Sequence, residues 1–211
     1  ALRHEYVEVD EPQALGALAR LIRSELLAYE AAGSPRESQP RMIVFCPDGA
    51  SAVGVARPLQ NALWSGLGGD VDAGLCGLSV LLPSAEDRVR MGPDNATMHV
   101  QESSLRILEQ FSAGSTNLLV TTVGATRGLD FPNVTNVYNL GVVGRPADYL
   151  HRAGRVGRIG HQTQGTVTSI VDGAGVRDLE ALGLELGFAP VPREVPLQFN
   201  VTLESAQDDQ V

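Results

Sequence analysis

Hydrophobic and polar positions follow two alternating patterns along the 211 residues of the chain. In some segments apolar residues recur every three or four positions, which predicts amphipathic helices. Other segments are short, continuous apolar runs, which are typical of strands buried on both faces. The predicted helices are Pro12–Tyr29, Ser51–Leu63, Gln101–Phe111, Pro146–Arg158 and Val176–Leu186. The predicted strands are Met42–Cys46, Leu75–Leu82, Asn117–Thr122, Val134–Leu140 and Thr166–Val171.

Alternation of strands and helices predicts an α/β fold, a three-layer sandwich in which helices cover both faces of a mostly parallel sheet. Pro58 lies inside the second helix and is expected to kink or break it. Residues 83–98 are polar without periodicity, which indicates an insertion loop. We expect one domain over residues 1–199, followed by a disordered acidic tail at 200–211.

Composition excludes several classes of chemistry. The chain has 16 basic residues, all of them arginine, against 25 acidic residues, and its net charge is −9. Without lysine there can be no P-loop lysine, Schiff base or Ser–Lys pair. Cys46 and Cys76 are too few for a disulfide scaffold, which favours an intracellular setting of unspecified compartment. No metal site is expected, no apolar run approaches the roughly 18 residues that span a membrane, and the first residues do not resemble a signal peptide.

Residues 145–161 concentrate positive charge in this acidic chain. The segment contains four arginines and one acidic residue, Asp148, which gives it a local charge of +3. On a helix, His151, Arg155 and Arg158 would share one face, with Arg152 turned by about 100°. Arginine binds phosphate oxygens with two parallel hydrogen bonds, so this pattern favours an anionic ligand. The alternative is a solvated cationic edge of a helix.

A second cluster, at residues 121–132, follows a predicted buried strand. In parallel α/β sheets, ligands bind at the carboxyl ends of the strands, so this loop is well placed. It offers hydroxyls, glycine backbone, Arg127 and Asp130. Hydroxyls and amides suit nucleic-acid phosphates, and a carboxylate suits a ribose diol. An ordinary turn with a salt bridge remains the alternative.

Together these segments resemble the DEAD-box RNA helicases. Thr122–Pro132 is similar to motifs Va and V of that family, His151–Arg158 to motif VI, and Met42–Cys46 to motif IV. The sequence Leu-Glu-Gln-Phe at 108–111 resembles the helix that leads to motif V. The similarity extends over most of the predicted domain, and it implies the second, C-terminal RecA-like domain. The first domain would carry the P-loop lysine and the Asp-Glu-Ala-Asp motif, which this sequence lacks.

The resemblance implies a nucleotide site shared between two domains. ATP with Mg would be bound mainly by an N-terminal RecA-like domain in cis. Arg155 and Arg158 would be arginine fingers, the catalytic residues that reach the ATP. Gly128 and Asp130 would complete the nucleotide-binding set, with Asp130 at the ribose. His151 would couple the ATP and RNA sites.

The resemblance also implies an RNA surface that contacts the sugar-phosphate backbone and opens short duplexes locally. Its residues would be Thr122, Arg127, Gly128 and Arg152, with Arg127 also bracing the loop. The sequence departs from the family pattern at three places. Val123 replaces the usual aspartate, and Ser104 stands where a Gln-x-x-Arg element would place arginine, so the set of RNA-binding residues is smaller than usual. The third departure is the 83–98 insertion, which offers a surface for a protein partner.

These departures leave a second hypothesis open, a non-catalytic helicase-like scaffold or RNA-binding assembly module. An unrelated nucleotide- or cofactor-binding α/β enzyme is a third alternative. It is disfavoured because no glycine-rich dinucleotide fingerprint follows the strand at Ile43.

Overall fold

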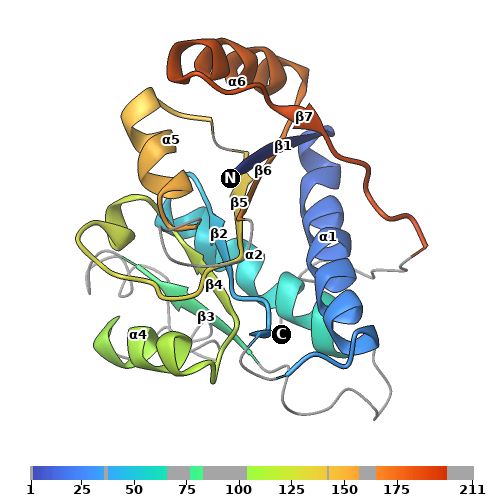
Figure 1. The fold of residues 1–211 in the computed structure, drawn as a ribbon, viewed down its shortest axis with the longest axis vertical. Helices are drawn as coiled ribbons and strands as arrows, with labels where there is room; N and C mark the ends of the chain where they lie inside the picture. Colours follow the sequence, from blue (N-terminus) through green and yellow to red (C-terminus); the bar gives the residue numbers. More distant parts are fainter. Residues whose placement is uncertain are drawn as a thin grey trace, which may run out of the picture.

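The computed structural model describes residues 2–35, 38–65, 77–82, 104–141, 143–156 and 165–198. In these ranges, seven strands form one sheet in the order β3-β4-β2-β5-β6-β1-β7, and every neighbouring pair is parallel (Figure 1). The strands are β1 (Arg3–Glu8), β2 (Met42–Phe45), β3 (Leu78–Leu81), β4 (Leu118–Thr121), β5 (Asn136–Leu140), β6 (Thr166–Val171) and β7 (Val191–Pro192). The α/β prediction is therefore confirmed.

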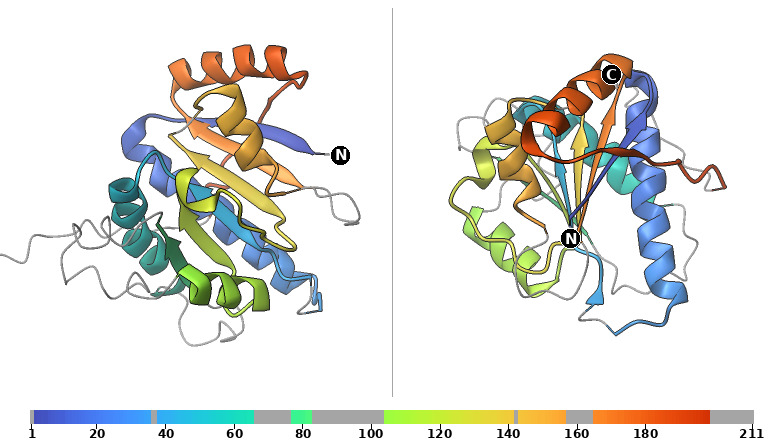
Figure 2. Two further views of the ribbon diagram at one scale, coloured as in Figure 1. Left: turned by 90° about the vertical axis from the view of Figure 1, so that its left-hand side faces the viewer. Right: turned by 45° about the horizontal axis from the view of Figure 1, so that its top comes forward.

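Helices cover the sheet on both sides, as the apolar runs indicate. They are α1 (Glu11–Ala31), α2 (Gly49–Gln60), α4 (Ser104–Ala113), α5 (Pro146–Ala153) and α6 (Gly173–Leu186). Helices α1 and α2 lie on one face, and α4, α5 and α6 lie on the other (Figure 2). The molecule thus has the three predicted layers.

Strand β2 shows how one apolar run serves two cores. Successive strand residues point to opposite faces of a sheet. Accordingly, Met42 and Val44 pack in the cluster under α1 and α2, whereas Ile43 and Phe45 pack in the cluster under α4, α5 and α6. All four side chains have 0% exposure, so the strand needs apolar residues at every position.

Two of the predicted helices differ from those observed. Pro58 does not break α2, although its ring nitrogen cannot donate to the carbonyl of residue 54. The helix continues to Gln60 and then widens into a π-helical turn at Asn61–Ser65. Helix α5 ends at Ala153 rather than Arg158, and Gly154 caps it. Consequently Arg155 lies in the turn beyond the helix, so the helix predicted to extend through Arg155 is wrong there, and Arg158 lies outside the described residues.

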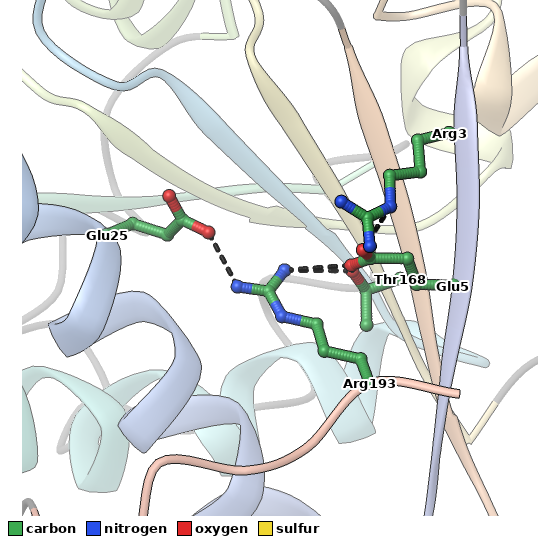
Figure 3. Close-up of polar contacts among 5 residues, drawn as sticks. All are labelled: Arg3, Glu5, Glu25, Thr168 and Arg193. Atoms are coloured by element: carbon green, nitrogen blue, oxygen red, sulfur yellow. Dashed lines mark hydrogen bonds and ion pairs between the residues drawn. The ribbon is translucent and has the colours of Figure 1, made fainter. Parts of the chain in front are cut away.

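Strand β1 is not predicted by the apolar pattern, because its sequence Arg-His-Glu-Tyr-Val-Glu is mostly polar. A buried ion network accounts for this composition (Figure 3). Glu5 is 4% exposed and accepts from Arg193 at 3.1 Å, and Arg193 also bonds Glu25 of α1 at 2.7 Å. Arg3 contacts the other Glu5 oxygen at 2.8 Å. Arg193 thereby ties the segment after β7 to β1 and α1.

We predict that Arg193→Met lowers the free energy of unfolding by about 2–4 kcal/mol, because it removes a partner from a buried carboxylate. Urea denaturation measures this change. Arg57→Met, which removes an exposed arginine of α2, is the matched control and should change stability by less than about 0.5 kcal/mol. Equal effects of the two substitutions would contradict the role given to this network.

Candidate functional site

The candidate site lies at the carboxyl ends of β4 and β5, which both pair with β2. Since all three strands are parallel, the loop after β4 and the helix after β5 emerge at the same edge of the sheet. The loop begins with a 3-10 turn at Gly124–Thr126. The Thr121 hydroxyl anchors its start by donating to the Leu81 carbonyl at 2.8 Å, and the Thr126 hydroxyl donates to the Val123 carbonyl at 3.2 Å.

Arg155 joins the two predicted clusters. Its Nη1 donates to the Leu129 carbonyl at 2.5 Å, and its Nε donates to the His151 carbonyl at 3.1 Å. The Leu129 contact places the half-buried guanidinium beside Asp130, whose side chain is exposed. Arg155 therefore lies against the backbone of the residue that precedes Asp130.

Phe131 forms the apolar support under this arginine. The Arg155 guanidinium carbon lies 5.9 Å from the centroid of the Phe131 ring, which is within range of a cation–π interaction. Phe131 is 1% exposed, and it meets Phe111 of α4 edge-on with 6.0 Å between ring centroids. These aromatic contacts were not predicted from the sequence. The available signal was the aromatic residue directly after Asp130.

His151 acts as a neutral acceptor toward Arg155. Arg155 Nη2 lies 2.9 Å from His151 Nε2, and because guanidinium only donates, the imidazole nitrogen must accept. Burial lowers the pKa of His151, and the positive charge of Arg155 lowers this pKa further. Both effects favour the neutral ring that the contact needs.

Arg152 does not occupy the position predicted for an RNA-binding residue. It is 1% exposed and points into the protein, where its Nε donates to Asn139 Oδ1 at 2.7 Å and its Nη2 donates to the Val143 carbonyl. Asn139 in turn donates to the Ser169 hydroxyl at 3.0 Å. Burial lowers the pKa of Arg152 to about 10, so it remains charged at neutral pH. Its observed role is to fix α5 to the sheet, and a buried asparagine in an apolar strand is the sequence signal for this network.

Arg127 lies at the exposed surface of the site. Its side chain is 66% exposed, and its Nη2 lies 3.8 Å from Asp148 Oδ1 at the start of α5. Arg145 contacts the other oxygen of Asp148 at 3.1 Å. Arg127 and Arg145 therefore both lie beside Asp148, and Arg127 keeps a largely exposed guanidinium.

Thr122 and Gly128, which both lie in the loop after β4, differ in their exposure to solvent. Thr122 is 6% exposed, whereas Gly128 is exposed. Gly128 has φ +74°, a conformation that favours glycine, and a Cβ there would meet no atom within 4 Å. The glycine therefore serves backbone conformation, not close packing. Val123, in place of the expected aspartate, packs against the apolar cluster that contains Phe131.

Several sequence predictions fall outside the described residues. These are Arg158, the Gln101 position of the expected RNA-binding element, the 83–98 insertion and the tail at 200–211. Among the residues that the structure does describe, no group of His, Cys, Asp and Glu could hold a metal ion. Within the same ranges, no helix is long and apolar enough to cross a membrane.

Comparison with known proteins supports the similarity in sequence. Residues 89–160 match the family of the helicase conserved C-terminal domain. A 60-residue stretch is 50% identical to the ATP-dependent RNA helicase RhlB of Pectobacterium atrosepticum and covers 28% of this chain and 14% of that protein. RhlB of Aliivibrio fischeri is 47% identical over 60 residues, with the same coverage. The aligned stretch thus spans only about one seventh of these relatives.

Solved structures support the fold over nearly the whole chain. The E. coli DEAD-box protein SrmB, bound to regulator of ribonuclease activity A, aligns with a TM-score of 0.63 and 22% identity over 92% of both chains. Domain 2 of the Mss116p DEAD-box helicase, bound to an RNA duplex, aligns with a TM-score of 0.62 and 19% identity, covering 92% of this chain and 64% of that one.

The chain therefore has a RecA-like fold shared with these DEAD-box proteins, and residues 89–160 are similar to the helicase conserved C-terminal domain. The resemblance to the C-terminal domain of the DEAD-box RNA helicases is confirmed by the family match, the RhlB relatives and the DEAD-box structures.

We predict that Arg152→Met destabilises the protein by about 2–4 kcal/mol, because the Asn139 and Val143 oxygens lose a buried, charge-assisted donor. Arg152→Lys retains the charge but cannot reach both oxygens with a planar guanidinium, so its free energy of unfolding should lie between those of the wild type and Arg152→Met. Urea denaturation checks both. Arg127→Met is the exposed control, and a loss as large as that of Arg152→Met would contradict the assignment.

The contact between Arg155 and His151 predicts a specific titration. In an NMR pH titration, the His151 ring should show a pKa below its ordinary value of about 6.5. Arg155→Met removes a neighbouring positive charge and should raise this pKa. Because the folded-state pKa is lowered, His151 should reduce stability as the pH falls below about 6.5. An unchanged His151 titration in Arg155→Met would show that the two side chains do not interact in solution.

Proposed function

We propose that this chain is the C-terminal RecA-like lobe of an ATP-dependent RNA helicase. The observation that carries this proposal is the position of Arg155, which contacts the Leu129 carbonyl beside the exposed Asp130 carboxylate. A guanidinium and a carboxylate at the carboxyl edge of a parallel sheet suit a nucleotide held between two lobes. The RhlB relatives are named as ATP-dependent RNA helicases, which supports the same activity in the whole protein.

In this proposal, Asp130 accepts hydrogen bonds from ribose hydroxyls, and Gly128 lets the backbone approach the nucleotide. Arg155 and Arg158 neutralise charge that develops on the transferred phosphoryl group, a role worth about 10³–10⁵-fold in related reactions. An N-terminal RecA-like domain in cis binds most of the ATP and its Mg. The magnesium ion neutralises phosphate charge. Contacts to His151 and Phe131 keep Arg155 oriented before ATP binds.

RNA would lie beside this nucleotide site and contact Arg127 and Gly128, while Thr122, with 6% exposure, would support the loop that carries them. Arg127 offers an exposed guanidinium, and Gly128 offers an exposed backbone amide. Phosphate contacts of this kind position RNA without reading its sequence. Arg152 is left out, because its buried guanidinium is committed to Asn139 and Val143. Mss116p domain 2 bound to an RNA duplex supports RNA binding by this fold.

A non-catalytic helicase-like scaffold is the second candidate. Val123 packs into the apolar cluster where the family pattern expects aspartate, and buried Arg152 removes one expected RNA contact. The 83–98 insertion is a proposed partner surface, and we place the protein inside the cell. The sequence of the N-terminal lobe separates the two candidates, because an enzyme needs its P-loop lysine and acidic magnesium-binding motif.

We predict that the protein with its N-terminal lobe hydrolyses ATP when RNA is present and that Arg155→Ala reduces kcat by about 10³-fold or more. Arg155→Lys should recover little, because lysine lacks the planar fork. Steady-state phosphate release measures both. Arg57→Ala on α2 is the surface control. The 211-residue chain alone should show no turnover.

Two results would contradict the enzymatic proposal. Wild-type turnover by Arg155→Ala would refute the arginine-finger role. RNA binding without any ATP hydrolysis by the two-lobe protein would favour the scaffold.

A further inference from the structure

A cavity lies at the carboxyl edge of the sheet, apart from the candidate nucleotide and RNA site. Its volume is about 740 Å³, and it lies among the N-terminal ends of α1, α2 and α6. The carboxyl ends of β2, β5 and β6 meet these helices there, as Cys46, Leu140 and Ile170 show. None of the residues that bring Arg155 and Asp130 together lines it.

The inner wall of this cavity is apolar. Leu15 of α1, Val55 of α2, Leu140 at the end of β5 and Ile170 of β6 contribute to it. Cys46 lies deeper, with 2% exposure, and burial together with Asp48 raises its pKa to about 12. The thiol is therefore neutral at physiological pH and behaves as part of the apolar wall. A volume of this size is typical of sites that enclose a bulky apolar group.

The rim of the cavity is acidic. Glu11, Asp172 and Asp178 are its charged lining residues, all of them exposed, and none of the described residues that line it is basic. Asp172 is partly committed, because its Oδ1 accepts from the Gly175 amide at 2.8 Å. Arg177 also lies on α6, but its guanidinium is near Gly173 and Glu8 and does not line the cavity. This charge would repel RNA phosphates and attract cations.

We propose that this cavity is a docking site for a protein segment that inserts an apolar side chain flanked by arginine or lysine. The apolar wall would bury the inserted side chain, and Glu11 and Asp178 would pair with the flanking cations. Charge complementarity of this kind guides partner choice and association rate. The docking site does not depend on ATP hydrolysis by the proposed helicase.

An occupant would also contact the connection between β5 and α5. Val143 and Gly144 form part of the cavity wall, and the Val143 carbonyl accepts from Arg152. Arg152 lies one residue after His151, which contacts Arg155. A docked segment would therefore touch the same loop that Arg152 holds against α5.

The test is an NMR titration of the isotope-labelled 211-residue chain with three short peptides. The probe peptide alternates arginine with leucine and tryptophan. One comparison peptide replaces each arginine with glutamate, and the other replaces each apolar residue with glycine or serine. Only the probe should shift resonances of Val55, Leu140, Val143 and Gly175. Its affinity should fall as salt is added, because the rim charges are exposed.

Two variants make the titration specific. Gly54→Leu adds a side chain at the cavity wall where a Cβ meets no atom within 4 Å, and it replaces a helical glycine, so the variant should fold and block the probe. Glu11→Gln combined with Asp178→Asn should weaken binding about fivefold, as expected for two exposed ion pairs. Arg57→Ala, outside the lining, should bind normally.

Several outcomes would overturn the proposal. These are no shifts with the probe, equal shifts with the glutamate peptide, and probe binding that persists in Gly54→Leu. A short oligouridylate that shifts the same resonances would assign the cavity to RNA instead.

Discussion

The contact between the Arg155 guanidinium and the Leu129 carbonyl joins two segments that are 26 residues apart in the chain. It depends on the parallel pairing of β4 and β5 with β2, because this pairing brings the ends of both strands to one edge. Phe131 supports the arginine from the loop side, and His151 accepts from it on the helix side. Arg152 connects α5 to the sheet through its hydrogen bond to Asn139 of β5. Each of these groups is partly or fully buried.

Much of the fold could be predicted from the sequence, because the central strands are buried on both faces. Strands such as β2 must be apolar throughout, and that pattern is unambiguous in length and position. Strand β1 was missed since its buried carboxylate, Glu5, is stabilised by Arg193, which is 188 residues away. A local pattern cannot reveal a partner at that distance. The length of α5 was overestimated because periodicity continues through Gly154, whereas the structure ends the helix there.

The sequence predicted which residue types belong to the candidate site, but it did not predict which of their side chains point outward and which are buried. Motif resemblance singled out Asp130, His151 and Arg155, and in the structure Arg155 contacts both His151 and the carbonyl of Leu129, the residue before Asp130. Arg152 belongs to the same motif, yet it points inward and bonds Asn139. Successive residues on a helix, such as His151 and Arg152, point about 100° apart, and only the neighbouring strand decides which one is buried. Phe131 has no polar function of its own and acts through its contact with Arg155, which sequence reasoning did not consider.

The carboxyl edge of the sheet carries two surfaces of opposite charge. Arg127, Arg145 and Arg155 lie around the loop after β4 together with Asp130 and Asp148, whereas the charged residues of the cavity among α1, α2 and α6 are all acidic, namely Glu11, Asp172 and Asp178. The chain as a whole has a net charge of −9, so the basic surface is a local concentration and not a general property. One edge can therefore present phosphate-binding and cation-binding surfaces without direct competition.

The central claim is that Arg155 is held ready for a nucleotide bound on another lobe. A crystal structure of the two-lobe protein with RNA and ADP–beryllium fluoride tests it directly. The account predicts that the Arg155 guanidinium lies within hydrogen-bonding distance of the fluoride group, with the Asp130 carboxylate at the ribose. A closed complex in which Arg155 stays turned away from the nucleotide, or in which Asp130 contacts no part of it, would contradict the account.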